Sequence, residues 1–197
     1  MGAVLLRRPG LENGGDNELP CRVAGTAIHR AIVEQPTVRK KARVKFRVTP
    51  IGLVHNSRLD PADTDHWGDV VSSIVIDERF GDDCLVGLNE FSHVEVVFVF
   101  DRMAERSDYS ARRRPRGRAD MPEVGVFGAR GPGRPNRIGV TTSELLTVGE
   151  RELVVRGLDA VDGTPVLDVK PVIREFLPRG VRQPDWATTL MREYFVS

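Results

Sequence analysis

From residue 44 onward, apolar positions alternate with polar ones in short segments, which is the period of a β-strand. The clearest segment covers residues 93–100, where Val94, Val96, Phe98 and Phe100 share one face. Further strands are predicted over residues 44–54, 73–76, 151–158 and 165–173, with Gly or Pro interrupting or bounding most of them. Several short strands separated by turn residues predict a mainly β domain, arranged as a barrel or a sandwich.

One helix is predicted near the C-terminus. Asp185 stands at a capping position, and Trp186, Leu190, Met191 and Tyr194 follow at helical spacing. We expect this apolar stripe to pack into the core.

Residues 1–43 show no sustained period and contain Gly14 and Gly15 among scattered polar residues. We interpret them as a flexible or loosely docked N-terminal extension, or as the product of an overlong translational start, and place the β domain at residues 44–197. Basic residues gather where the two meet: Arg39, Lys40, Lys41, Arg43, Lys45 and Arg47. They fit either a solvated edge strand, whose charges prevent pairing with another chain, or a phosphate-binding arm.

The composition is that of an ordinary soluble globular protein, with 40% hydrophobic residues, 29% charged residues and a net charge of +1. No apolar run approaches the roughly 20 residues that span a bilayer, and the first residues make no convincing signal peptide. The two cysteines, Cys21 and Cys84, lie far apart, which favours free thiols in the cytoplasm. The four histidines show no ligand spacing, so no metal site is expected.

Positive charge is nevertheless concentrated in one segment. Residues 102–137 hold ten arginines against four acidic residues, and the segment RRRPRGR at 112–118 contains too much Pro and Gly to form a helix. It is either a solvated loop or an electropositive loop that binds phosphates in a salt-dependent manner.

A second unusual segment is the loop over residues 125–139, GVFGARGPGRPNRIG. Glycine lets a backbone approach a ligand closely, proline stiffens the loop, and arginine offers a planar fork to a carboxylate or phosphate. An arginine-rich surface turn is the alternative.

A third segment, LDAVDGTPVLDVKP at 158–171, combines a turn with a charged strand. Asp162 and Gly163 predict a turn, and the alternation after it places Asp168 and Lys170 on one face. That pair is either an exposed ion pair or a proton acceptor beside a charge stabiliser in a cleft. No GxGxxG follows a predicted strand, so a nucleoside cofactor would need another arrangement than the usual dinucleotide-binding sheet.

Together with GLNEFSHVEVVFVF at 87–100, the last two segments resemble the TsaA-like (YaeB-like) family in order and spacing, over roughly residues 46–180. Members of this family include the tRNA methyltransferase that acts on N6-threonylcarbamoyladenosine beside the anticodon. The resemblance implies a small closed or partly open β-barrel with a C-terminal helix, a homodimer, and an S-adenosylmethionine site near the subunit interface.

Carried over residue by residue, the resemblance places the cofactor at Asp101, Arg102, Arg130, Val140, Asp162, Gly163, Thr164 and Pro165. Asp168 and Lys170 become the candidate catalytic residues. Candidate contacts to tRNA are Arg112, Arg113, Arg114, Arg116, Arg134 and Asn136.

Two positions depart from the family pattern. Residues 65–69 read Asp-His-Trp-Gly-Asp where the family has a Pro-Arg-Gln segment that helps to hold the cofactor, so Trp67 is a candidate replacement for that cofactor contact. Val172 stands where the family often has tyrosine. The first hypothesis is methyl transfer from S-adenosylmethionine to a nitrogen of modified adenosine in tRNA. The alternatives are a methyltransferase of a small molecule or another non-tRNA substrate, and a non-catalytic module that binds S-adenosylmethionine or RNA.

Overall fold

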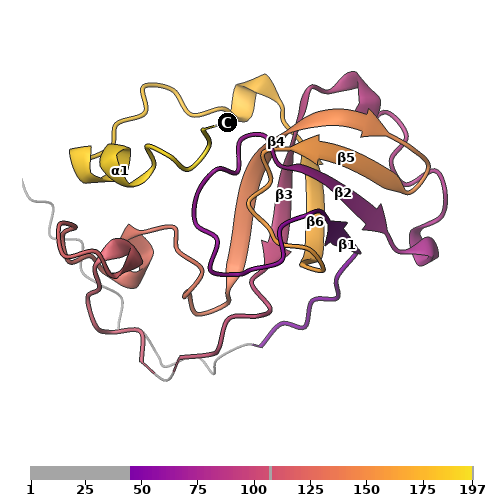
Figure 1. Ribbon diagram of the computed structural model, residues 1–197. Helices are drawn as coiled ribbons and strands as arrows, with labels where there is room; N and C mark the ends of the chain where they lie inside the picture. The colour runs from indigo at the N-terminus through magenta and orange to yellow at the C-terminus, as the bar shows by residue number, and fades with distance from the viewer. Residues whose placement is uncertain (1–44, 107, 197) are drawn as a thin grey trace, which may run out of the picture. The chain divides into compact units, whose positions relative to one another are not determined.

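The strands close into a barrel with neighbours in the order β1-β2-β5-β4-β3-β6, and every neighbouring pair is antiparallel (Figure 1). The computed structural model describes residues 45–106 and 108–196. The strands are β1 (Gly52–His55), β2 (Val71–Ile76), β3 (His93–Val99), β4 (Ile138–Val148), β5 (Glu152–Arg156) and β6 (Pro165–Pro171). The predicted barrel is therefore confirmed, whereas the predicted extension at residues 1–43 lies outside the described residues.

Short helical elements lie between and after the strands. The 3-10 helices are η1 (Glu78–Phe80), η2 (Leu88–Glu90), η3 (Pro115–Gly117), η4 (Val126–Gly128) and η5 (Arg174–Phe176). The α-helix in the described part of the chain is α1 (Asp185–Leu190), which confirms the predicted C-terminal helix.

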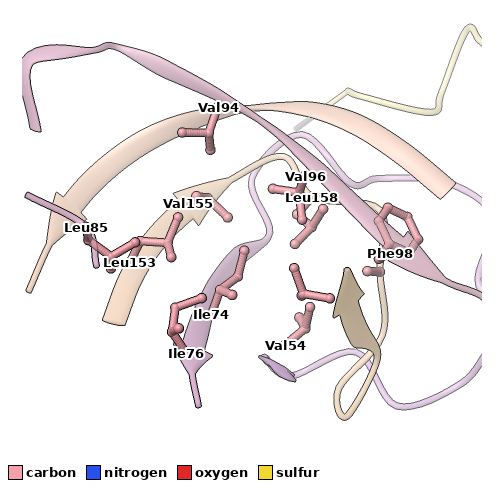
Figure 2. Close-up of a cluster of buried hydrophobic side chains, with 12 residues drawn as sticks. Val54, Ile74, Ile76, Leu85, Val94, Val96, Phe98, Leu153, Val155 and Leu158 are labelled. Carbon is pink, nitrogen blue, oxygen red and sulfur yellow. The ribbon is translucent and has the colours of Figure 1, made fainter. Parts of the chain in front are cut away.

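The core fills the inside of the barrel (Figure 2). Alternation along β3 buries Val94, Val96 and Phe98, each at most 1% exposed, while Phe100 beyond the strand end is only half-buried. The same buried cluster includes Val54 of β1, Ile74 of β2, Leu153 and Val155 of β5, and Val166 of β6. Each such side chain contributes about 1.5–3 kcal/mol on burial, so the barrel interior supplies most of the hydrophobic stabilisation.

The longest strand, β4, was not predicted. Its inward positions are Gly139, Thr141 and Ser143, which are small or polar and so hide the apolar alternation of a strand. Gly139 pairs with Phe98 across the sheet, and a Cβ at position 139 would overlap the phenylalanine ring. Small inward residues on β4 thus make room for a large one on β3.

The prediction of a strand from residue 44 was wrong for its first half. Residues 45–50 are exposed and form no strand, and Phe46 is 87% exposed. The strand begins at Gly52, which lies opposite Ile76 of β2 and Val166 of β6. Alternation alone cannot make a strand without partners, and Pro50 has no amide hydrogen to offer one.

The details predicted for the C-terminal helix were also wrong. Pro184 is the N-cap, and Asp185 lies in the first turn and makes no capping bond. Trp186, Leu190 and Tyr194 are only half-buried and Met191 is exposed, because a helix of six residues lies outside a barrel that the strands already fill.

In the part of the chain that the structure describes, no helix is both long enough and apolar enough to cross a membrane.

Candidate functional site

Several predicted cofactor residues lie at one end of the barrel. In this antiparallel sheet β3 ends at Val99 opposite the first residue of β4, Ile138, and β6 begins at Pro165 beside β1. The segments at 101–102, 130–140 and 162–165 therefore belong to the same end, which we call the site end.

The turn that precedes β6 is held firmly in place. Gly163 adopts a φ of 77°, a conformation that suits glycine, and its amide donates to the carbonyl of Val54 at 2.8 Å. The amide of Asp162 donates to the carbonyl of Arg58 at 2.8 Å. Thr164 is buried and Pro165 begins β6. These two residues can therefore contribute backbone groups to the site, but no exposed polar side chain.

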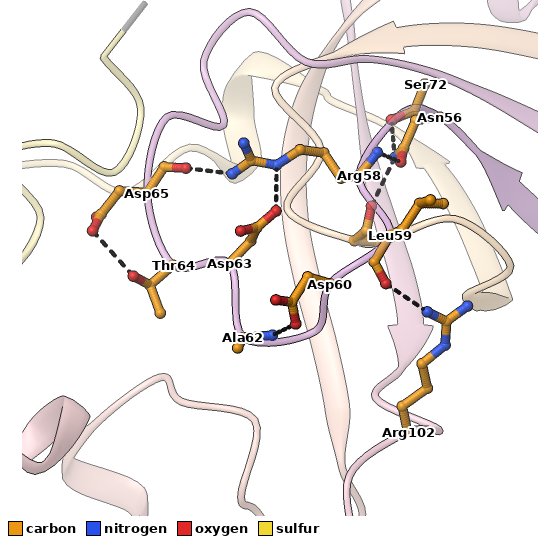
Figure 3. Close-up of polar contacts among 11 residues, drawn as sticks. Asn56, Arg58, Leu59, Asp60, Ala62, Asp63, Thr64, Asp65, Ser72 and Arg102 are labelled. Carbon is orange, nitrogen blue, oxygen red and sulfur yellow. Dashed lines mark hydrogen bonds and ion pairs between the residues drawn. The ribbon is translucent and has the colours of Figure 1, made fainter.

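Arg102 joins the turn to the loop after β1. Its guanidinium donates to the carbonyl of Asp162 at 2.6 Å and to the carbonyl of Leu59 at 2.9 Å; Figure 3 shows the second bond. Arg102 remains exposed, as does its neighbour Asp101. The predicted grouping of residue 102 with residues 162 and 163 is thus present in the structure.

Asn56 is a site residue that sequence reasoning missed. Its side-chain amide donates to Ser72 Oγ and to the carbonyl of Ala160, both at 2.8 Å, and its side-chain oxygen accepts from the amide of Arg58 (Figure 3). Its backbone amide donates to Asp162 Oδ1 at 3.3 Å, which orients that carboxylate. A single asparagine after a short strand carries no sequence signal for such a role.

Arg130 and Val140 form a second contact at the site end. The Arg130 guanidinium donates to the carbonyl of Val140 at 2.6 Å, and both residues are exposed. The structure therefore brings together two predicted cofactor residues that are ten positions apart.

Next to Val140, the hydroxyl of Thr141 donates to the carboxylate of Asp159. The other carboxylate oxygen of Asp159 accepts from the Tyr194 hydroxyl at 2.5 Å. Burial, with Asp159 alongside, raises the pKa of the Tyr194 phenol above its ordinary value, so the phenol stays a donor. Asp159 stands inside the segment 158–171, yet alternation and turn chemistry assigned it no role.

Asp168 and Lys170 lie on one face of β6, as predicted, and form an exposed ion pair with Nζ 2.5 Å from Oδ2. The hydrogen bond that the Lys170 ammonium donates to Asp168 raises the pKa of Lys170. At about 3.3 Å per residue, Asp168 lies roughly 10 Å and Lys170 roughly 17 Å along β6 from Pro165. The pair is therefore on the barrel exterior and away from the turn; its acid–base role stays a prediction.

The arginine loop (residues 112–118) is partly neutralised by acidic neighbours. Arg116 binds both carboxylate oxygens of Asp65 at 2.8 Å, which lowers the pKa of Asp65. Ion pairs also hold Arg114 to Glu123 and Arg118 to Asp120. By contrast, the exposed side chains of Arg112 and Arg113 make no hydrogen bond or ion pair with any residue that the structure describes. These two are the loop's free cations in the described region.

Arg134 mainly shapes its own loop. Its guanidinium donates to the carbonyl of Ala129 at 2.7 Å and lies over the ring of Phe127 at 5.4 Å. Asn136, in contrast, is exposed. Of the two residues predicted to contact RNA in this loop, Asn136 is thus the more accessible.

Trp67 is only 3% exposed, and the guanidinium of Arg58 stacks on its ring at 4.5 Å. The ring is therefore packed and presents no open face to a ligand. Among residues 45–106 and 108–196, no group of three or more His, Cys, Asp or Glu side chains is placed to hold a metal ion.

Comparisons with known proteins show the family of this chain. The family model of the tRNA-methyltransferase O N-terminal domain matches residues 52–176. A tRNA (adenine(37)-N6)-methyltransferase of Mus musculus is 44% identical over 92 residues, which are 47% of this chain and 21% of that protein. A probable S-adenosyl-L-methionine-binding protein of Methanothermobacter thermautotrophicus is 39% identical over 131 residues, 65% of this chain and 90% of that one.

The fold is also found among solved structures. The crystal structure of TrmO from Pseudomonas aeruginosa superposes with a TM-score of 0.58 at 26% identity, covering 71% of this chain and 61% of that one. The chain spans only about a fifth of the length of the mammalian relatives, 21% in the mouse protein and 22% in the human one.

Proposed function

Since this chain belongs to the family of the tRNA-methyltransferase O N-terminal domain, we propose that it is an S-adenosylmethionine-dependent methyltransferase of tRNA. The proposed acceptor is a nitrogen of threonylcarbamoyl-modified adenosine next to the anticodon. The observation that carries the proposal is the gathering of Arg102, Arg130, Val140 and Asp162 at one end of the barrel.

The donor set at the site end fits the proposed cofactor. Arg130 is exposed and uses one guanidinium nitrogen on Val140, which leaves others to bind a carboxylate. Asp162 has a half-buried carboxylate, which suits an ammonium or sulfonium group. When bound, S-adenosylmethionine supplies an electrophilic methyl group.

The protein's own contribution at this end is mainly positioning. Arg102 and Asn56 fix the turn at 162–163 relative to the loop after β1, so the groups that would hold the cofactor need not reorganise. Methyl transfer requires donor carbon and acceptor nitrogen in line, and a pre-set site lowers the entropic cost of that alignment.

For the chemistry, Asp168 is the candidate proton acceptor, with Lys170 holding its carboxylate at 2.5 Å. An amide-like nitrogen is a weak nucleophile, and removal of its proton assists attack. Both residues are exposed, so this role requires the RNA to lie along β6 and cover them.

The proposed RNA contacts are Arg112 and Arg113, with Asn136 at the neighbouring loop. The arginines present free positive charge at the surface, which suits phosphates. We further propose a homodimer in the cytoplasm, with the cofactor site near the subunit interface, as the family resemblance implies.

The test is to incubate the protein with labelled S-adenosylmethionine and tRNA, then identify the methylated nucleoside. tRNA lacking the threonylcarbamoyl group is the matched control and should take up no label. Label transfer that does not depend on tRNA would favour a small-molecule substrate instead. A salt-dependent tRNA complex without methyl incorporation would favour a non-catalytic binding module.

A further inference from the structure

Residues 193–195 lie across the loop that follows β1. The amide of His66 donates to the carbonyl of Glu193 at 2.9 Å, and the amide of Trp67 donates to the carbonyl of Tyr194 at 2.8 Å. A Cβ at position 68 would overlap the carbonyl oxygen of Phe195, so the chain passes directly over Gly68. Residues 193–195, which we call the C-terminal strap, lie beyond the family match at 52–176.

From this strap the Tyr194 side chain contacts Asp159, which is connected to two parts of the candidate cofactor site. Its hydroxyl donates to Asp159, and Asp159 also accepts from Thr141. Thr141 directly follows Val140, the acceptor of the Arg130 bond, and Asp159 stands three residues before Asp162. One carboxylate therefore links the strap to β4 and to the segment that leads into the turn.

The same tyrosine also contacts the arginine loop. The guanidinium of Arg116 lies 5.6 Å from the centre of the Tyr194 ring while both of its terminal nitrogens bind Asp65. Cation–π contacts of this kind favour one fixed placement of the arginine. The Tyr194 hydroxyl thus contacts the candidate cofactor site, and the Tyr194 ring contacts the arginine loop.

We propose that Tyr194 is a positioning residue for both ligands of the proposed methyltransferase. Its hydroxyl, through Asp159, holds the start of β4 in place relative to the turn at 162–165. Its ring, through Arg116, holds the arginine loop beside the same site. This inference rests on the proposed function, because it assigns the two regions to cofactor and RNA.

The state of the phenol supports this role. Burial raises the pKa of Tyr194, so the hydroxyl remains protonated and donates to the Asp159 carboxylate throughout the neutral range. A hydrogen bond to a charged group is stronger than one between neutral groups, which suits a contact that has to hold a defined geometry.

The first experiment separates the role of the Tyr194 hydroxyl from the role of its ring. Tyr194→Phe removes the donor and keeps the ring, and Tyr194→Leu removes both. Tyr109→Phe is the matched control, since it removes the hydroxyl of the other tyrosine in the chain, which accepts from the amide of Arg106. S-adenosylmethionine affinity is measured by calorimetry and tRNA affinity by filter binding, each per folded molecule.

We expect Tyr194→Phe to weaken cofactor binding about tenfold, the equivalent of one lost charge-assisted hydrogen bond, while tRNA affinity stays the same. Tyr194→Leu should weaken the binding of both cofactor and tRNA, and Tyr109→Phe should change neither affinity. Asp159→Asn also alters the bond from Thr141, so it should weaken cofactor binding at least as much as Tyr194→Phe. The double variant should be no worse than Asp159→Asn alone, because the tyrosine hydroxyl acts through Asp159. A Tyr194→Phe variant with a lower melting temperature but unchanged cofactor affinity would reduce the tyrosine to a structural role.

Amide hydrogen exchange tests the same geometry without any ligand. Tyr194→Phe should speed exchange at residues 140–141 and 162–164 relative to Tyr109→Phe. Unchanged exchange there would overturn the inference even if the protein proves to be a methyltransferase. The unmodified chain could also fail to bind the cofactor while hydrogen exchange changes as expected. That result would overturn the proposed function and the ligand role of Tyr194, but the structural link from Tyr194 through Asp159 to Thr141 would stand.

Discussion

At the scale of single residues, Arg130 offers the sharpest test of the cofactor site. It is exposed, and among the residues that the structure describes its side chain binds one backbone carbonyl, that of Val140 at 2.6 Å, so its removal should not disturb the core. Arg130→Ala is expected to weaken S-adenosylmethionine binding by about 1.5–3 kcal/mol, the scale of a hydrogen bond to a charged group. Calorimetry measures this, with Arg112→Ala as the control. Equal affinities in the two variants would remove Arg130 from the cofactor site.

Asp168 and Lys170 pose a different question, because an exposed ion pair contributes little to stability. If the pair takes part in proton transfer, Asp168→Asn and Lys170→Met should lower the rate of methyl transfer by roughly a hundredfold or more at unchanged cofactor affinity. Single-turnover kinetics with saturating cofactor measure that rate. A loss below about threefold in both variants would leave the pair as a surface contact only, given the general scale of proton-transfer effects.

At the scale of elements, the arginine loop divides into paired and free cations. Arg112 and Arg113 are free in the described region, whereas Arg118 is bound to Asp120 with Nη2 2.6 Å from Oδ2. Replacing both free arginines by alanine should make the negative slope of log affinity for tRNA against log salt shallower by about 1.4–1.8, at 0.7–0.9 per phosphate contact. Arg118→Ala should change it less. Identical slopes for all variants would mean that the loop does not touch RNA.

The strand β4 provides a stability test of the barrel. Gly139→Ala places a methyl group against the ring of Phe98 and should destabilise the fold by about 1–3 kcal/mol, as overpacking does. Gly131→Ala, where nothing lies within 4 Å of the added carbon, is the matched control and should have little effect. Urea denaturation compares the two. Equal free energies of unfolding would mean that β3 and β4 are less tightly packed than described.

At the scale of the whole molecule, the proposed dimer can be tested directly. Light scattering at micromolar concentration, with S-adenosylmethionine present, should report twice the chain mass of 21.9 kDa. Arg130→Ala should keep that mass, since the residue is proposed to bind cofactor rather than a partner. A single-chain mass for the unmodified protein would contradict both the dimer and a site shared between subunits.

The sequence by itself determined the features that depend on neighbours in the chain. Alternation from Val94 to Phe98 identified β3 and its buried face, the Asp162–Gly163 pair identified the turn, and period two placed Asp168 and Lys170 together. These features are local, because the face of a strand and the φ of a turn follow from side chains a few positions apart.

Only the tertiary structure decided the features that depend on distant partners. β4 escaped prediction because its inward positions are small, a choice that makes sense only opposite Phe98. Asn56 meets Ala160 across 104 positions, and Tyr194 meets Asp159 across 35. Sequence periodicity reports which way a side chain points, but not which side chain it meets, because that depends on strand order and register.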